Sequence, residues 1–97
     1  MKRVLVVVDY QNDFVNGALG FEGADKIDSG IAKLFKEYAT AEDGVVFCTF
    51  DTHDKNYLNT QEGKKLPVEH CIKGTEGWEL FGETSKEFND YVFKKRF

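Results

Sequence analysis

Two short apolar runs, separated by an amphipathic segment, constrain the fold of this chain more than any other feature. The runs are Val4–Val8 and Val45–Phe50, and both are rich in β-branched residues without polar alternation. Such runs are typical of strands buried on both faces of a parallel sheet. Between them, the pattern predicts a helix from about Asp25, as its N-cap, to Tyr38, because its apolar residues recur on one helical stripe.

The order strand, helix, strand predicts a right-handed crossover and a parallel pair. Both strands then end at the same edge of the sheet, which brings Asp9 and Asp51 to one rim. Open α/β sheets place their ligands at this rim.

The C-terminal part is expected to add a helix, capped by Thr84 or Ser85 and ending near Phe88, and a third strand that begins at Tyr91. A parallel sheet needs helices on both faces, and the expected helices do not supply two full layers. We therefore expect an α/β fold, a three-layer Rossmann-like parallel sheet with flanking helices and about three strands. Residues 1–97 would form the N-terminal half of this domain.

Metal-ligand residue types follow the second apolar run. Asp51 and His53 stand two residues apart, and a polar loop leads back to His70 within Pro67–Cys71. Two imidazoles and one carboxylate, with room for water, suit zinc or a similar divalent ion. The alternative is that Asp51 forms a turn and His53 is merely solvated. Glu62 could add a carboxylate, but we interpret it as a solvated loop residue.

Composition argues against several classes of function. The net charge is −4 with acidic and basic residues mixed, unlike the clustered basic face of nucleic-acid-binding proteins. No apolar stretch approaches the length of a membrane span, and Val4–Val8 is too short for the apolar core of a signal peptide. With two cysteines and no export signal, we expect reduced thiols and a cytoplasmic protein.

Three segments at characteristic intervals carry a resemblance to a known family. They are Asp9–Phe14, with the string Gln-Asn-Asp-Phe, then Asp51–His53 and Pro67–Cys71, joined by Gly74 and Gly77. Together they resemble the isochorismatase-like cysteine hydrolases, most closely the nicotinamidase branch. The resemblance runs from Val4 to Phe97 and implies a doubly wound α/β fold of about twice this length.

The resemblance implies an amidase that reacts through a thioester on a cysteine. It assigns one catalytic base, one catalytic lysine, one aromatic residue of the substrate pocket and three ligands of a divalent metal, which would be zinc, or else iron or manganese. The base is Asp9, the aromatic residue of the pocket is Phe14, and the ligands are Asp51, His53 and His70. The lysine is Lys94, which stands three residues before Phe97 as in the family pattern, with Lys95 as the weaker candidate. A base and an ammonium group both favour the reactive thiolate.

The chain also departs from the family pattern. The nucleophilic cysteine of the family belongs to a later strand, and neither Cys48 nor Cys71 stands at the matching position. Leu66 replaces the tryptophan that nicotinamidases usually carry before Pro67. The pocket would therefore lack one stacking wall, which leaves amides other than nicotinamide open as substrates.

The leading functional expectation is a nicotinamidase-like, metal-assisted hydrolase that converts nicotinamide or a related small amide to the acid. The alternatives are an inactive fragment that only binds metal and an isochorismatase-type hydrolase of another small substrate. An aspartyl phosphotransferase with Asp9 as acceptor would usually carry a second carboxylate where Gln11 stands. We expect a small-molecule amide as partner, no nucleic acid or membrane, and either homo-oligomers or association through the incomplete sheet, because an unfinished sheet leaves a pairing edge.

Overall fold

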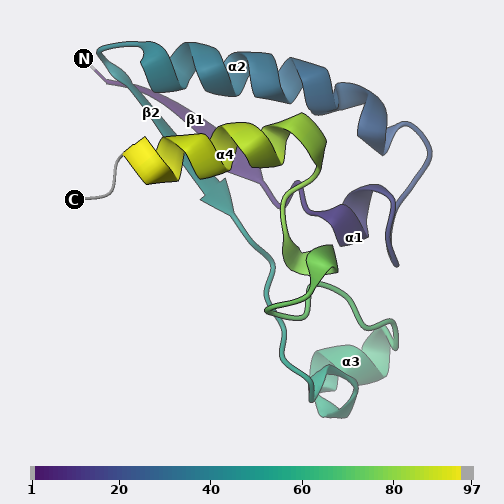
Figure 1. Cartoon of the computed structure of the whole chain (residues 1–97). Coiled ribbons are helices and arrows are strands. Elements are labelled where there is room, and N and C mark those ends of the chain that lie inside the picture. Colours follow the sequence, from purple (N-terminus) through teal and green to yellow (C-terminus); the bar gives the residue numbers. More distant parts are fainter. Residues whose placement is uncertain (1, 95–97) are drawn as a thin grey trace.

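The structure is a computed structural model that describes residues 2–94. Figure 1 shows a strand pair beside two long helices, and a smaller lobe below the ends of the strands. The elements are, in chain order, β1 (Arg3–Val8), α1 (Asn12–Val15), a 3-10 helix (Ala24–Ile27), α2 (Asp28–Thr40), β2 (Gly44–Thr49), a 3-10 helix (Tyr57–Asn59), α3 (Gln61–Lys65), a 3-10 helix (Glu76–Trp78) and α4 (Gly82–Lys94).

The predicted β1–α2–β2 unit is confirmed. The two strands pair in parallel, in a register that runs from Arg3 opposite Gly44 to Val8 opposite Thr49. The N–H of Asp9 donates to the carbonyl of Thr49, so the pairing continues one residue past β1. The two strands therefore end at a common edge, above the lobe that carries α3 (Figure 1).

The predicted third strand is wrong, because residues 91–94 continue α4. Phe88 and Tyr91 are three residues apart, which places them on the same helical face. Both pack against the core, and the Tyr91 ring lies edge-on to Phe35 of α2 at 5.7 Å between centroids. Helical packing thus prevails over the strand propensity of a short aromatic and β-branched run. Within residues 2–94 the sheet has two strands.

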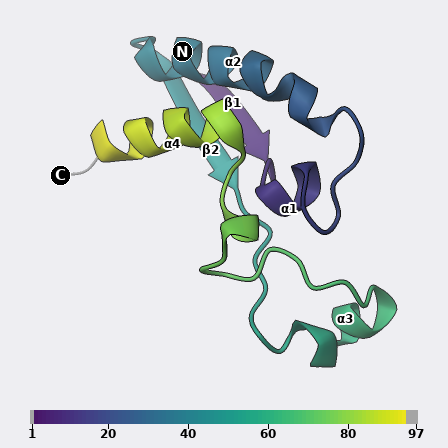
Figure 2. The same cartoon turned by 45° about the vertical axis from the view of Figure 1, so that its right-hand side comes forward.

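The expectation that both strands are buried on both faces is also wrong for the described residues. One face carries Val7 and Val46, which pack with Phe35 of α2 in the core. The opposite face is open, and Val6 and Phe47, which are register partners on it, are 51% and 58% exposed. Both long helices pack on the first face, with α4 alongside α2 (Figure 2), and none of the described elements covers the second.

α2 begins later than predicted, and its first residue stabilises a different helix. Asp25 lies within a 3-10 helix and makes no cap, and α2 starts at Asp28. The Asp28 carboxylate accepts hydrogen bonds from the N–H groups of Glu83 and Thr84 at 2.9 and 3.0 Å and from the Thr84 hydroxyl at 2.8 Å. These are free donors of the first turn of α4. The cap predicted for Thr84 or Ser85 is thus supplied by Asp28 instead.

Replacing Asp28 with alanine should destabilise the fold by about 2–3 kcal/mol, because it removes a charged acceptor and leaves buried donors unsatisfied. Urea denaturation followed by circular dichroism measures the loss. Asp28→Asn keeps one carbonyl acceptor and should lose less. Equal stability of the alanine variant and the parent chain would contradict this capping role.

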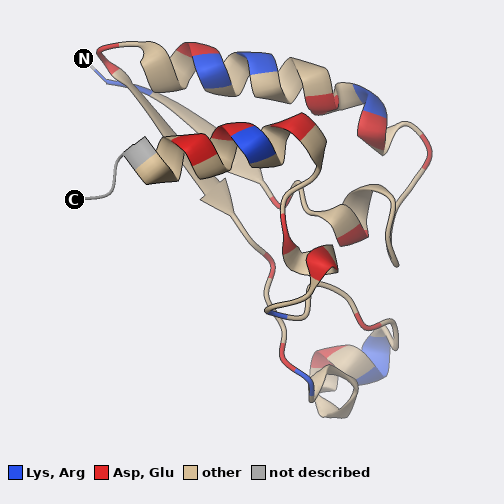
Figure 3. Cartoon of the chain, viewed as in Figure 1, with Lys and Arg blue, Asp and Glu red and all other residues tan. Residues whose placement is uncertain are grey.

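Charge is distributed as composition predicts. Within the part of the chain that the structure describes, acidic and basic residues are interspersed along α2 and α4 (Figure 3), rather than clustered into the basic face typical of nucleic-acid-binding proteins. Among residues 2–94, no helix combines the length and the apolar character that crossing a lipid bilayer requires.

Candidate metal centre

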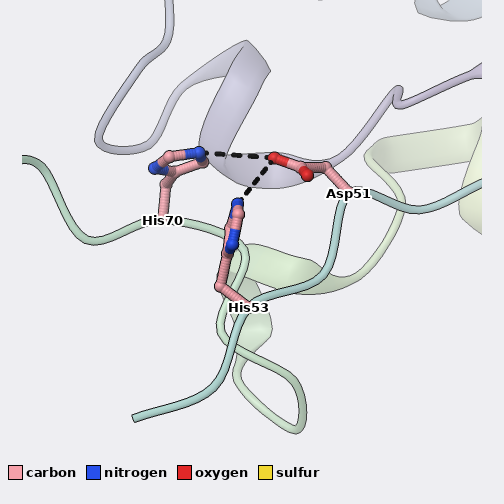
Figure 4. Close-up of side chains that lie close together, drawn as sticks. All are labelled: Asp51, His53 and His70. Carbon is pink, nitrogen blue, oxygen red and sulfur yellow. Dashed lines mark hydrogen bonds and ion pairs between the residues drawn. The ribbon is translucent and has the colours of Figure 1, made fainter. Parts of the chain in front are cut away.

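The side chains of Asp51, His53 and His70 converge (Figure 4), and Asp51 lies two residues past Thr49, the last residue of β2. The Nε2 atoms of His53 and His70 lie 3.2 and 3.3 Å from the same oxygen, Oδ2 of Asp51. One ligand atom from each of the three residues lies within 4.8 Å of the other two. Carboxylate and imidazole donors this close can share one divalent ion. The structure thus brings together the three side chains that the sequence singled out.

His70 is held in one orientation. Its Nδ1 lies 2.7 Å from the carbonyl oxygen of Val68, and the residue is 3% exposed. With Nδ1–H donating to that carbonyl, the lone pair on Nε2 points toward Asp51. A backbone acceptor on the second ring nitrogen is the usual way in which proteins orient a metal-binding histidine.

Glu62 of α3 lies at the open side of the site. The sequence predicts a solvated loop residue at this position. Glu62 is solvated, with a side chain that is 62% exposed, but it belongs to α3, and its Oε2 lies 3.3 Å from Nε2 of His53. The His53 ring therefore faces two carboxylates. This second carboxylate adds negative charge where a cation would bind.

Two aromatic rings wall the site. Tyr57 contacts both imidazoles edge-on, with centroids 4.6 Å from His53 and 5.0 Å from His70. It is 1% exposed, and its hydroxyl donates to the carbonyl of Leu66 at 2.8 Å. Phe14 lies 5.6 Å from the His70 ring, a position compatible with the substrate-pocket role that the resemblance implies. Sequence reasoning missed Tyr57, whose only signal was an aromatic ring in a polar loop.

Asp9 occupies a strained position at the end of β1. Its φ is 52°, which costs a non-glycine residue about 1 kcal/mol or more. The Thr49 hydroxyl donates to its Oδ1 at 2.7 Å. Strain of this kind persists where surrounding contacts fix the residue, as they do at many active sites.

The lysine predicted to act with Asp9 is placed differently from expectation. Lys94 is the last residue of α4, so its predicted place at the end of a third strand is wrong, because the helix extends through it. Its side chain lies outside the described part of the chain, as do Lys95 and Phe97. Its catalytic role stays a prediction.

Neither cysteine has the environment of an activated nucleophile. Burial, followed by the negative charge of Asp51, raises the pKa of Cys71 to about 12. Burial alone raises the pKa of Cys48 to about 11. Both thiols are free, and with these pKa values both are protonated at neutral pH. A reactive cysteine needs the opposite, a lowered pKa.

Cys48 should therefore alkylate slowly in the native chain. At pH 9, a thiol with a pKa of about 11 is only about 1% thiolate, whereas an ordinary thiol is mostly ionised there. In a Cys71→Ser variant, iodoacetamide should modify Cys48 at least about tenfold more slowly without denaturant than in urea. Equal rates in the two conditions would contradict the raised pKa.

Comparisons with known proteins place the chain. Residues 3–97 match the isochorismatase domain. A Bacillus subtilis (strain 168) protein described as the uncharacterized isochorismatase family protein PncA is 41% identical over 86 residues, which is 86% of this chain and 46% of that protein.

Solved structures agree with this match. The nicotinamidase/pyrazinamidase PncA from Bacillus subtilis superposes with a TM-score of 0.84 at 35% identity, covering 98% of this chain and 52% of its own. A pyrazinamidase/nicotinamidase from Streptococcus mutans gives 0.80 at 30% identity, covering 96% and 52%. The pyrazinamidase of Pyrococcus horikoshii in complex with zinc gives 0.68 at 30% identity, covering 79% and 43%. The chain spans about half the length of these proteins.

Proposed function

The chain belongs to the isochorismatase family, and on this basis we propose that it forms the metal-binding part of a nicotinamidase-like amide hydrolase. The proposed reaction of the full-length protein converts nicotinamide or a related small amide to the acid. The convergence of Asp51, His53 and His70 carries the proposal. It is supported by structural relatives that are nicotinamidases and pyrazinamidases, one of them in complex with zinc.

The donor set fits a divalent ion. Two neutral imidazoles and a carboxylate, with a further position left open, suit catalytic zinc, and iron or manganese accept the same donors. His53, His70 and Asp51 would hold the ion, with Glu62 at its open side. A bound ion would act there as a Lewis acid or orient water.

The remaining residues act around that ion. Phe14 would supply apolar surface beside His70 for a planar ring, while the buried ring of Tyr57 packs against both imidazoles. Asp9, oriented by the Thr49 hydroxyl, would take the proton from a thiol nucleophile supplied by another part of the domain. Lys94 would favour the thiolate through its positive charge.

Ammonia release by the full-length protein tests the proposed reaction. After loading with zinc, manganese or iron, the protein should hydrolyse nicotinamide, pyrazinamide or both. Because Leu66 replaces the tryptophan expected before Pro67, a panel of smaller and non-aromatic amides belongs in the same assay. Cleavage of isochorismate without turnover of any amide would move the assignment to the vinyl ether hydrolases of the family, and turnover of neither would refute both.

A second candidate is that this 97-residue chain binds metal by itself but does not turn over amides. The raised pKa values of Cys48 and Cys71 favour it, because no thiol here is activated. Calorimetric titration with zinc should then show binding, while the same sample releases no ammonia from nicotinamide. Turnover by the isolated chain would refute this candidate.

A cytoplasmic location is part of the proposal. Both cysteines are free, which is typical of proteins kept in a reducing compartment. Fractionation of cells that express the full-length protein, with detection by an antibody, would test the location directly.

We also propose that the chain associates with itself through the open face of its sheet. Val6 and Phe47, paired across the strands, give this face an apolar surface, and exposed apolar patches favour association. Light scattering should show a mass that rises with concentration. Phe47→Lys should reduce the association, whereas Phe93→Lys, on α4 and 74% exposed, should leave it unchanged. A monomeric mass at every concentration would refute this mode.

A further inference from the structure

The loop that follows β1 contacts the segments that carry the candidate ligands. Gln11 is fully buried and holds the backbone of Asp51 from both sides. Its Nε2 donates to the Asp51 carbonyl at 2.9 Å, and its Oε1 accepts from the Asp51 N–H at 2.9 Å. The backbone of Asp51 therefore cannot move without breaking two partly buried hydrogen bonds.

Asp13 holds the segment that carries His70 through one hydrogen bond. Its Oδ2 accepts from the N–H of Cys71 at 2.7 Å, across 58 positions of sequence. Cys71 follows His70 directly, is fully buried, and has a φ of 50°. That conformation is costly for a residue with a Cβ, and a short hydrogen bond from its N–H group offsets the cost.

The same residue links Asp13 to the second histidine. The carbonyl of Cys71 accepts from the N–H of His53 at 2.9 Å. Two hydrogen bonds, made by the N–H and the carbonyl of Cys71, thus connect the Asp13 carboxylate to the backbone of His53. His70 directly precedes Cys71 in the sequence.

We propose that Asp13 is a positioning residue for the metal centre, which holds His53 and His70 in place through the strained backbone of Cys71. The inference rests on the proposed metal-binding function. It goes beyond that function, because Asp13 acts on neither metal nor substrate and its effect passes through the backbone of a residue that is itself no ligand. This role requires a hydrogen-bond acceptor at position 13 and does not require a negative charge there.

Gly77 provides an independent way to move Asp13. A Cβ at position 77 would overlap the carboxylate of Asp13. The φ of Gly77 is not in the left-handed region, so alanine fits the backbone there. Gly77→Ala should therefore displace the Asp13 carboxylate without altering any candidate ligand.

The test uses the 97-residue chain with Asp13→Ala, Asp13→Asn, Gly77→Ala and the double variant Asp13→Ala/Gly77→Ala. Zinc affinity is measured by competition with a chromogenic chelator, and the visible spectrum of the cobalt-loaded chain reports ligand geometry. Hydrogen exchange of the Cys71 amide is followed by NMR in metal-free protein. Glu69→Ala is the matched control, because it removes an exposed carboxylate beside His70.

Asp13→Ala should weaken zinc binding about 10–100-fold, change the cobalt spectrum and accelerate exchange of the Cys71 amide. Asp13→Asn should rescue most of the affinity, because its carbonyl oxygen still accepts the hydrogen bond. Gly77→Ala should resemble Asp13→Ala but add little to it in the double variant, because both changes break one contact. Glu69→Ala should bind zinc like the parent chain.

The inference would be overturned if Asp13→Ala left both the zinc affinity and the hydrogen exchange of the Cys71 amide unchanged. It would also be overturned if Asp13→Asn and Glu69→Ala lost zinc affinity equally, because that result would reveal an effect of charge alone. Parent chain that binds no metal would refute the proposed function and, with it, the positioning role. Should Asp13→Ala fail to fold, Gly77→Ala and Asp13→Asn decide the matter.

Discussion

Replacing His70 with alanine is expected to abolish stoichiometric zinc binding by the chain, weakening the affinity about a hundredfold or more. Structural zinc sites gain about 10–16 kcal/mol from four ligands, or roughly 3 kcal/mol for each. His70 is the most buried of the three candidate ligands, at 3% exposure, and Val68 orients its Nε2 toward Asp51. Isothermal titration of the metal-free chain measures the loss.

His70 is also packed in the interior, so the variant needs controls for folding. His70→Asn keeps a donor for the Val68 carbonyl and should fold like the parent while losing zinc as well. Asp54→Ala is the matched control, because Asp54 lies next to His53 in the same loop and accepts a local hydrogen bond from Asn56. Retention of parent-like affinity in a folded His70→Asn would contradict the ligand assignment.

Replacing Asp9 with asparagine in the full-length protein should lower kcat for amide hydrolysis by about a hundredfold or more, the range expected for loss of a general base. Asparagine has the same shape but cannot accept the thiol proton. KM should change little, because Asp9 is assigned to the reaction step rather than to substrate binding. Steady-state kinetics with nicotinamide or pyrazinamide measure both constants.

Thr49→Val tests whether the orientation of Asp9 matters. It removes the hydroxyl that donates to Oδ1 of Asp9 and should lower kcat by about tenfold, less than Asp9→Asn does, because the base itself remains. Activity of Asp9→Asn within about threefold of the parent protein would show that Asp9 is not the base.

Local patterns in the sequence were sufficient to predict the β1–α2–β2 unit. Continuous β-branched runs and one helical stripe specify it, and the parallel direction of the two strands places both carboxyl ends at one edge. The same reasoning brought Asp51 beneath the sheet edge. It could not show that Tyr91 continues a helix, because three residues of strand propensity are outweighed by packing of Tyr91 against Phe35.

The open face of the sheet could not be predicted either, since an apolar run indicates that a strand tends to be buried but not which element packs on it. Val6 and Phe47 read as core residues in the sequence, but none of the described elements packs on them. Whether a strand residue is buried depends on the element that packs on its face, and the residues of the strand alone do not specify that element.

The contacts that organise the metal centre have no local sequence signal. Gln11 and Asp13 reach Asp51 and Cys71 across 40 and 58 positions, and such pairs become visible only in three dimensions. Asp13 accepts a hydrogen bond from Cys71, which lies in a distant segment of the chain. The metal-ligand residue types could be read from the sequence, whereas the scaffold that positions them could not.

X-ray absorption at the zinc edge tests the central claim most directly, because it reports which atoms surround the bound ion. The zinc-loaded chain should show only nitrogen and oxygen neighbours at about 2.0–2.1 Å, with the outer-shell scattering of two imidazoles. Its two histidines make that count diagnostic. A sulfur neighbour at about 2.3 Å, which would place Cys71 in the coordination sphere, or the absence of imidazole scattering would contradict a site built from Asp51, His53 and His70.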